Sequence, residues 1–547
     1  MSKLAINETV IWAQLHQHQR ATRHLHMRDL FADNPQRFAQ MHEQLDGFLL
    51  DYSKNRITEE TLNLLVELAE TAELPQWMRR MCCGEKINDS ESRAVLHTAL
   101  RLPASATLEV DGENIVPQVQ HELNRALDFA ENIRSGSLKT SRGEIFTDVV
   151  NLGIGGSDLG PQTLTQALRP YHAPQLNVHF VANVDGTDLA QVLEKINLVT
   201  TLFIISSKSF TTPETLLNAH AVRERLCAQL PEEAVAQHFA AVSNNLDAAA
   251  AFGIPRERVF TVFEWVGGRY SATSAIGLPL MCAIGAERFR ELLAGAHAMD
   301  EHFFHAPLRH NMPVLLALIG IWYNTFYRAH SHAVIPYHHG LRRFPAHIQQ
   351  LDMESNGKQT SRHGDYLDFD TGPIIWGEAG VNCQHAFFQL LHQGSRLIPS
   401  DFIVVVNGDY DNDVHQKTLV ANALAQTRAL MAGKSEAQVY RELADLPAMR
   451  RDELMPQKHF PGNQPSNTIM LERLTPYYLG MLLALYEHKV FVQGVIWGIN
   501  SFDQWGVEYG KVLARDIAPK LDSTDSTAYD ASTDGLIRFF RQHHEHA

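Results

Sequence analysis

Hydroxyl side chains gather between a short apolar run and a predicted helix start within residues 200–217. The run Leu202–Ile205 is too short for a helix and rich in β-branched and aromatic residues, which predicts a buried strand. Pro213 stands where a first helical residue should, with a threonine before it as N-cap. Free N–H groups and the positive dipole end at a helix start suit a phosphate, although an ordinary capped turn also fits. The polar donors of this hydroxyl loop, residues 206–212, include Ser207, Lys208, Ser209 and Thr212.

Two further side chains stand in settings that suit chemistry, and each also fits an ordinary structural role. Arg269 follows two glycines and precedes a run of small residues, which fits a functional cation or a surface arginine in a turn. Glu354 falls in the last turn of a helix predicted to stop at Gly357. The helix dipole disfavours a carboxylate there, which makes Glu354 a candidate general base; a solvated glutamate is the alternative.

A histidine and a lysine in the last third of the chain also fit either a chemical or a structural role. His385 opens a predicted helix whose other residues are mostly apolar, so it is either a satisfied core histidine or an acid–base group. Lys511 ends a polar stretch and either takes part in chemistry or forms a structural ion pair with Glu508.

A glycine-rich loop, Gly153–Gly160, follows a predicted strand and resembles a dinucleotide-binding fingerprint. The acidic residue that such a fingerprint needs is missing, because the nearest candidate, Asp185, lies well beyond the required spacing. We therefore expect a turn that lets a substrate approach the backbone closely, with Ser157 donating a hydroxyl.

Strands alternate with helical segments from about residue 148, and this rhythm repeats after about residue 330. The pattern predicts an α/β protein with two doubly wound parallel-sheet domains, which bind ligands at the carboxyl ends of their strands. Earlier residues read as helical. The predicted strands cover residues 149–154, 178–181, 202–205, 239–242, 259–262, 332–335, 373–376 and 402–406, and the predicted early helices cover 35–50, 58–72 and 91–100.

Four domains follow from this pattern. A helical N-terminal segment, residues 1–119, is expected to pack on the larger sheet domain. The smaller sheet domain covers residues 120–286 and the larger one, with insertions, residues 287–514. Residues 515–547 form a C-terminal arm, with residues 522–527 as a linker.

Composition narrows the class of protein. The chain has 547 residues, 45% of them hydrophobic, and a net charge of −15, which fits a globular protein and argues against nucleic-acid binding. The apolar stretches 314–323 and 479–499 are better interpreted as buried helices than as membrane spans, because the first is too short to cross a bilayer and the second carries Glu487, His488 and Lys489 in its middle. The five cysteines show no C-x-x-C pattern, which favours a reducing cytoplasm, and the 29 histidines include no H-E-x-x-H metal motif.

Seven stretches resemble the phosphoglucose isomerase family, also called the glucose-6-phosphate isomerase family, in the family's order. They are GEKIN at 84–88, GIGGSDLGP at 153–161, SSKSFTTPET at 206–215, residues 266–277, MESNGK at 353–358, QHAFFQLLHQG at 384–394 and GINSFDQWGVEYGK at 498–511. The resemblance covers nearly the whole chain. One departure, Cys82-Cys83 before GEKIN, touches no catalytic position.

The resemblance implies sugar-isomerase-type domains and the interconversion of glucose 6-phosphate and fructose 6-phosphate through a cis-enediol, without metal or other cofactor. By similarity, Glu354 moves the proton, Arg269 stabilises the oxyanion, and His385 assists ring opening with Lys511 nearby. It also implies a homodimer with shared active sites, in which the histidine crosses from the partner subunit. The implied substrate-binding residues are Gly156, Ser157, Ser207, Lys208, Ser209, Thr212, Gln350 and Gln504.

Three other functions fit parts of the sequence. A metal-dependent aldose–ketose isomerase would need a cluster of carboxylate ligands, which the sequence does not show. A non-catalytic sugar-phosphate sensor on the same domain would keep the hydroxyl loop, but it would not need Glu354 or Lys511. A bifunctional enzyme that also accepts mannose 6-phosphate stays open.

Overall fold

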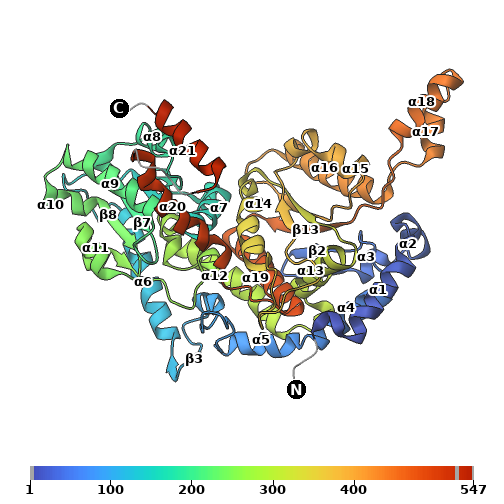
Figure 1. Ribbon diagram of the computed structural model, residues 1–547, viewed down its shortest axis with the longest axis horizontal. Helices are drawn as coiled ribbons and strands as arrows, with labels where there is room; N and C mark the ends of the chain where they lie inside the picture. The colour runs from blue at the N-terminus through green and yellow to red at the C-terminus, as the bar shows by residue number, and fades with distance from the viewer. Residues whose placement is uncertain (1–4, 524–528, 545–547) are drawn as a thin grey trace. The chain divides into compact units, whose positions relative to one another are not determined.

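The computed structural model describes residues 5–523 and 529–544. The chain divides into two compact units, residues 1–501 and residues 502–547. The first unit contains a five-stranded and a six-stranded sheet, as the sequence pattern predicts (Figure 1).

The smaller sheet has the strand order β6-β5-β7-β8-β9, and all its neighbouring strands run parallel. Each strand lies where the sequence predicts one. Their bounds are β5 (Asp148–Leu152), β6 (Asn177–Val181), β7 (Thr201–Ser206), β8 (Phe239–Val242) and β9 (Val259–Phe260).

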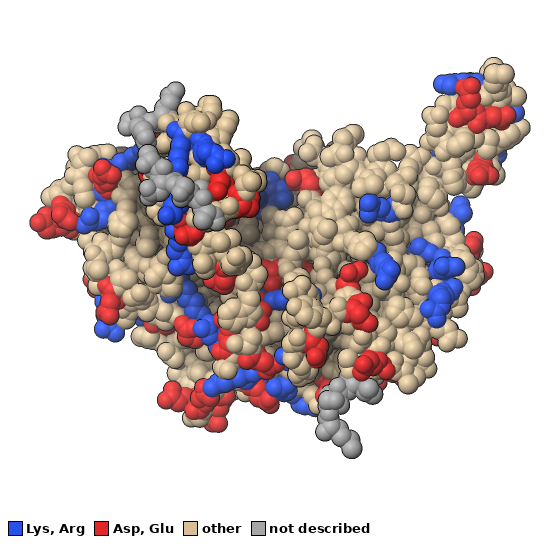
Figure 2. Space-filling view, in the orientation of Figure 1, with Lys and Arg blue, Asp and Glu red and all other residues tan. Residues whose placement is uncertain are grey.

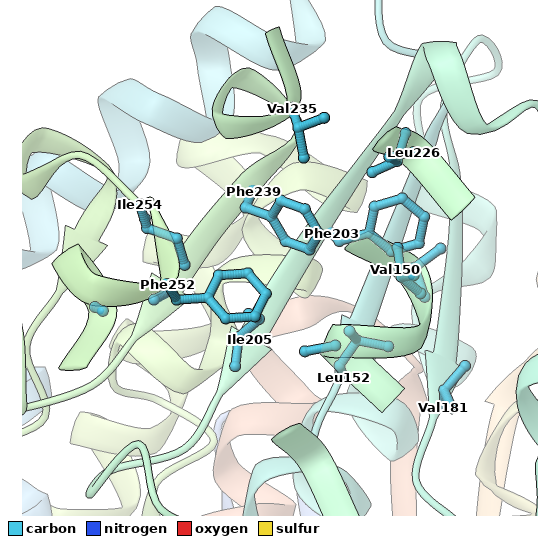
Figure 3. Packing of buried hydrophobic residues seen from close by; sticks show 14 of the residues in the cluster. Val150, Leu152, Val181, Phe203, Ile205, Leu226, Val235, Phe239, Phe252 and Ile254 are labelled. Atoms are coloured by element: carbon cyan, nitrogen blue, oxygen red, sulfur yellow. The ribbon is translucent and has the colours of Figure 1, made fainter. Parts of the chain in front are cut away.

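Helices cover the smaller sheet and close an apolar core against it. Phe203 of β7 and Phe239 of β8 lie with their ring centroids 5.7 Å apart, and Phe252 lies 5.2 Å from Phe239 (Figure 3). All three rings are buried, and their close packing makes the sheet a rigid support for the loops at its carboxyl edge. The helices of this region are α6 (Val116–Arg134), α7 (Leu159–Ala167), α8 (Gly186–Leu193), α9 (Pro213–Cys227), α10 (Glu232–Val235) and α11 (Leu246–Phe252).

The larger sheet has the strand order β1-β2-β13-β12-β10-β11. Strands β10 to β13 pair in parallel, whereas β2 runs antiparallel to β13 and β1 antiparallel to β2. Strand β13 has no counterpart among the predicted strands. The bounds are β1 (His42–Leu45), β2 (Phe48–Asp51), β10 (Ser331–Tyr337), β11 (Ile374–Trp376), β12 (Ser400–Asn407) and β13 (Ser466–Arg473).

Two of the predicted early helices are wrong. Of residues 35–50 only α3 (Arg37–Gln40) is helical, and the hairpin β1–β2 follows. Its turn is Asp46-Gly47, where both residues have positive φ, 47° and 80°, as tight hairpin turns require. Of residues 91–100 only the start of a 3₁₀ turn, His97–Arg101, is helical. The third prediction is confirmed by α4 (Glu59–Thr71).

Two long helices run through the first unit. α12 (Leu278–His305) is broken at Gly285, where φ is 83°, one residue from the predicted boundary at 286. α19 (Pro476–Trp497) is long and apolar enough to cross a membrane, yet its most apolar window is wholly buried in the structure, as expected of a core helix. The domain boundaries stay predictions. The remaining helices of this unit are α1 (Val10–Thr22), α2 (Met27–Asp33), α5 (Leu74–Cys82), α13 (Met312–Ile321), α14 (Phe344–Ile348), α15 (Phe388–Gln393), α16 (Asp413–Ala432), α17 (Glu436–Glu442) and α18 (Ala448–Lys458).

An insertion and a helical pair complete the described chain. α17 and α18 project from the body of the first unit (Figure 1), and acidic and basic side chains mix on their surface (Figure 2). The second unit holds α20 (Glu508–Asp522) and α21 (Ala531–His543). The predicted boundary at 514 falls within α20, and most of the predicted linker lies outside the described residues.

Candidate active site

A buried arginine and a partly exposed glutamate meet in the first unit. Arg269 lies on the 3₁₀ turn Gly268–Tyr270 that follows β9, and Glu354 ends the π-helix Gln349–Glu354 that follows α14. Arg269 Nη1 lies 3.8 Å from Glu354 Oε2, and the two side chains are 1% and 19% exposed. Arg269 is therefore a buried arginine and not a surface one, whereas the Glu354 carboxylate stays accessible to solvent.

Hydrogen bonds fix the direction of the Arg269 guanidinium. Its Nε donates to Ser355 Oγ at 2.6 Å, and its Nη2 donates to the carbonyl oxygen of Ser501 at 2.6 Å. The Tyr270 hydroxyl lies 3.0 Å from the same Ser355 Oγ. These bonds turn Nη1 toward Glu354. Ser355 is not among the site residues that the sequence predicts, although it directly follows Glu354.

The glycine loop packs against the turn Gly268–Tyr270, the arginine turn, so closely that no side chain fits at Gly156. A Cβ atom on Gly156 would lie 2.3 Å from the carbonyl carbon of Gly268 and 2.8 Å from the backbone nitrogen of Arg269. A Cβ on Gly155, where φ is 61°, would lie 3.3 Å from Gln350 Nε2 of the π-helix. Three segments from distant parts of the sequence therefore converge, bringing Gly156 and Gln350 to the Arg269–Glu354 pair.

Ser157 ends the short 3₁₀ turn Gly155–Ser157 of the glycine loop. Asn151 Nδ2 donates to its carbonyl oxygen at 2.9 Å, which ties the turn to β5. No bond of its hydroxyl group is seen among the described residues, so that group can donate to a ligand.

The hydroxyl loop follows β7, as predicted, and its side chains bond one another. Ser207 Oγ lies 3.0 Å from Thr212 Oγ1, and Ser209 Oγ lies 2.6 Å from Thr211 Oγ1. α9 begins at Pro213 as predicted, but Thr212 makes no side-chain capping bond. Hydroxyl groups paired in this way can rotate to donate to an anion.

Phe210 holds this loop to the core of the smaller sheet. It has a positive φ of 53°, which is costly for an aromatic residue. Its ring is 4% exposed and packs edge-on against Phe252 at 6.0 Å. Burial of the ring therefore fixes a strained loop and the hydroxyl groups on either side of it.

The ammonium group of Lys208 binds the chain that leads to Arg269. Its Nζ donates to the carbonyl oxygens of Phe263, Glu264 and Val266 at 3.2–3.3 Å. Burial lowers the pKa of Lys208, and the Glu264 carboxylate, 3.6 Å away, opposes that shift. Lys208 thus links two loops of the site, whereas the sequence suggested a direct phosphate donor.

His385 is exposed, so it is not a core histidine of this chain. It ends the 3₁₀ turn Asn382–His385, and α15 begins only at Phe388, so the predicted helix is interrupted. Within the described chain no hydrogen bond or ion pair is seen for it, and none joins it to Glu354.

Gln504 and Lys511 belong to the second unit. Lys511 Nζ lies 3.1 Å from Glu508 Oε1, so the ion pair that the sequence left open is present. Gln504 directly precedes the 3₁₀ turn Trp505–Val507.

A cavity of about 890 Å³ lies elsewhere, between α7 and the loops that follow β10 and β12. None of the predicted site residues lines it. Volume alone therefore does not mark the site, whereas the buried charge pair and the close backbone contacts do. Among the residues that the structure describes, no group of three or more His, Cys, Asp or Glu side chains is placed to hold a metal ion.

The fold and the site define an α/β protein of two sheets with a glutamate–arginine pair beside the carboxyl edge of the smaller one. The sequence model described as "PGI: Phosphoglucose isomerase" matches residues 51–537. The chain therefore belongs to the phosphoglucose isomerase family.

Named relatives agree over the full length. The chain is 62% identical over 540 residues to "Glucose-6-phosphate isomerase 2" of Chromobacterium violaceum, covering 98% of each chain. It is 57% identical to "Glucose-6-phosphate isomerase" of Laribacter hongkongensis, again covering 98% of each. A crystal structure of a glucose-6-phosphate isomerase from Chlamydia trachomatis superposes with a TM-score of 0.85 at 34% identity, covering 98% of this chain and 100% of that one.

Proposed function

We propose that this chain interconverts D-glucose 6-phosphate and D-fructose 6-phosphate; two relatives that it matches over 98% of its length are named as glucose-6-phosphate isomerases. The observation that carries the proposal is the Arg269–Glu354 pair, in which a buried cation lies 3.8 Å from a carboxylate that is partly exposed to solvent. A carboxylate in this position can move a proton, and a fixed guanidinium can stabilise the negative charge that results.

The proton transfer balances within the substrate. Glu354 takes the proton from C2 of the open-chain aldose, and the C–H electrons form the C1–C2 double bond of a cis-enediolate. Arg269 stabilises the negative oxygen. The hydroxyl proton on the C2 oxygen then passes to the C1 oxygen, the protonated Glu354 delivers a proton to C1, and the C2 oxygen becomes the ketone carbonyl. Because one carbon is oxidised as its neighbour is reduced, the step needs no external oxidant or reductant.

The hydroxyl loop binds the phosphate in this proposal, through Ser207, Ser209, Thr212 and the helix start behind them. Lys208 supplies positive charge from the loop's base, where it binds three carbonyl groups. The sugar lies against Gly156 and Ser157, with Gln350 and Gln504 positioning it.

Ring opening belongs to His385 and Lys511 in this proposal, and His385 comes from a partner subunit. Support for the second point comes from its exposure and from the exposed Ala386 and Leu390 that follow it, which leave this segment free to meet another chain. The working form is then a homodimer with two shared active sites.

We also propose a cytoplasmic location, where both sugar phosphates occur. All five cysteines are free thiols, which fits a reducing compartment.

A coupled assay with fructose 6-phosphate tests the proposal. A dehydrogenase that oxidises glucose 6-phosphate reports the product, and a parallel reaction contains a chelator. We expect turnover that the chelator leaves unchanged. No turnover would contradict the proposed activity, and loss of turnover with the chelator would contradict the metal-free proton transfer.

A further inference from the structure

The most apolar helix of the chain carries three charged or titratable residues in a row. Glu487, His488 and Lys489 lie in the middle of α19, and their exposed fractions are 2%, 0% and 1%. Burying such groups is costly unless each has a partner, and replacing them by apolar residues often stabilises a protein. A run of three therefore calls for an explanation beyond stability.

Each member of the run reaches a different element. Glu487 accepts from Arg101 at 2.8 Å, and His488 bonds Asp300 of α12 at 2.7 Å. Lys489 Nζ donates to Asp352 Oδ2 at 3.1 Å, and these two side chains are 1% and 0% exposed. Only the last contact reaches the π-helix that holds Glu354.

Asp352 lies on the buried side of that π-helix. Residues two positions apart on a helix point to opposite sides, so Asp352 faces the core while Gln350 lies near the glycine loop and Glu354 near Arg269. Its other carboxylate oxygen, Oδ1, has no hydrogen-bond partner among the described residues. The pair with Lys489 is therefore what anchors this side chain within the described chain.

Val490, which follows Lys489 on α19, provides a second anchor on the C-terminal side of Glu354. Asn356 Nδ2 donates to the carbonyl oxygen of Val490 at 3.1 Å, and Ser501 Oγ donates to Asn356 Oδ1 at 2.7 Å. Two successive residues of one core helix thus bind the positions two before and two after Glu354.

A π-helix needs such anchors because it is the less stable register. It is rare, and it occurs mostly as short stretches at functional sites. Relaxation to an α-helix shifts the register by one residue, which rotates the following side chains by about 100°. That rotation would carry the Glu354 carboxylate away from Arg269.

We propose that Lys489 is a positioning residue for the catalytic base: its buried pair with Asp352 locks the π register and so aims Glu354 at the substrate and at Arg269. This inference rests on the proposed isomerase activity. It assigns the buried lysine a role in turnover, whereas a purely structural role would affect only stability.

The test replaces the pair without leaving an unpaired charge. Asp352→Leu with Lys489→Met gives an apolar pair, which should keep the thermal midpoint at or above that of the wild type. We expect kcat to fall by about 10²-fold, because small misplacements of a catalytic group cost that much. KM should change little, since the phosphate binds at a different loop. A folded apolar-pair variant with wild-type kcat would overturn the proposal.

A second double variant keeps the proposal testable if the apolar pair does not fold. Asp352→Asn with Lys489→Gln preserves shape and one hydrogen bond without charge. We expect a partial rescue, with kcat roughly 3–10-fold below wild type and faster amide hydrogen exchange across residues 349–356. Wild-type kcat together with unchanged exchange in this segment would contradict the proposal.

His488→Gln is the matched control. It lies in the same buried run and keeps a donor toward Asp300, but its partner lies on α12. Its kcat should stay within about twofold of wild type even if its thermal midpoint falls. An equal loss of kcat in this control would show that any damage to α19 lowers turnover, and would sink the specific role of Lys489. If the wild type itself shows no turnover, the proposed function fails, while hydrogen exchange still measures the anchor.

Discussion

At the scale of single residues, Arg269 and Glu354 differ in burial, and this difference suits them to different roles. The guanidinium is 1% exposed and held by Ser355 and by the Ser501 carbonyl group, so its charge cannot turn away. The carboxylate is 19% exposed and can reach a ligand. In the proposed mechanism, Arg269 is a fixed charge beside the accessible base Glu354, an arrangement that would stabilise an enediolate without reorganisation during the reaction.

Glu354→Gln should lower kcat by about 10²–10⁴-fold, because a positioned base contributes that much. The amide nearly matches the carboxylate in shape, so the fold and the binding of a five-carbon aldonic acid phosphate should persist. Steady-state kinetics and ligand titration measure both effects.

Solvent labelling separates proton transfer from hydride shift at the same residue. Wild-type turnover in deuterated water should place deuterium on the product carbon. Product that stays free of label, with Glu354→Gln fully active, would contradict the role of the base.

The residue types of the site could be predicted from the sequence, but their contacts could not. A strand, a polar loop and a helix start are local patterns, so the sequence correctly predicts the hydroxyl loop between β7 and α9. The burial of Arg269 depends on Ser355 and Ser501, which lie far along the chain. The carbonyl partners of Lys208 and the exposure of His385 likewise depend on tertiary packing, which no local pattern encodes.

At the scale of elements, the contact between the glycine loop and the arginine turn sets the geometry. Gly156→Ala would place a Cβ 2.3 Å from the Gly268 backbone, so the two loops must separate. We expect a stability loss of about 1–3 kcal/mol and a fall in kcat of about 10²-fold. Thermal unfolding and steady-state kinetics measure these effects.

Gly186→Ala at the start of α8 is the matched control, because nothing lies within 4 Å of its added Cβ. It should leave kcat unchanged. A Gly156→Ala variant as active as this control would contradict the role of the close contact.

The core helix α19 predicts a pH dependence of stability. Burial raises the pKa of Glu487 to about 7, although Arg101 opposes the shift. Arg101 also faces Asp300, whose pKa it holds below the ordinary value against the effect of burial. One guanidinium faces two buried carboxyl groups, so Asp300 ionises first and Glu487 keeps its proton up to about pH 7.

A raised pKa in the folded state means that folding stability falls as pH rises from about 4.5 to 7. Glu487→Gln removes this dependence, so the variant should gain up to about 3 kcal/mol relative to wild type between pH 5 and pH 8. Denaturant unfolding at several pH values measures the difference. Exposed Glu453→Gln serves as control and should track the wild type; a constant difference for Glu487→Gln would contradict the assignment.

Apolar runs in the sequence predict every parallel strand except β13, because buried strands of both sheets are mostly continuous apolar runs. The hairpin β1–β2 is predicted wrongly as part of a helix over residues 35–50, because strands of only four residues are too short to show a clear period of two. The Asp46-Gly47 turn was the available signal. The π register of residues 349–354 has no sequence period that separates it from an ordinary helix.

At the scale of the whole molecule, the proposed dimer makes a prediction about mixtures. If each site takes Glu354 from one subunit and His385 from the other, homodimers of Glu354→Gln and of His385→Ala have no intact site. A mixed dimer has one site with both groups and one site with neither. Refolding the two inactive variants together should therefore restore a substantial fraction of activity.

Differently tagged chains confirm that mixed dimers form, and the coupled assay measures the recovery. Each variant refolded alone is the control. A mixture as inactive as its parents, with heterodimers present, would place both residues in one chain.

The pairing of β2 with β13 imposes an order on synthesis. Phe48–Asp51 bonds Thr468–Leu471, so the hairpin made near the start of the chain meets its partner strand only after about 400 further residues. At roughly 5–20 residues per second, a ribosome needs about 20–80 seconds for that stretch. During this time the edge of β2 is a nascent strand without its neighbour, open to pairing with other chains. The larger sheet is therefore the late and aggregation-sensitive part of the protein in the cell, whereas the smaller sheet, drawn from residues 148–260, can fold while translation continues.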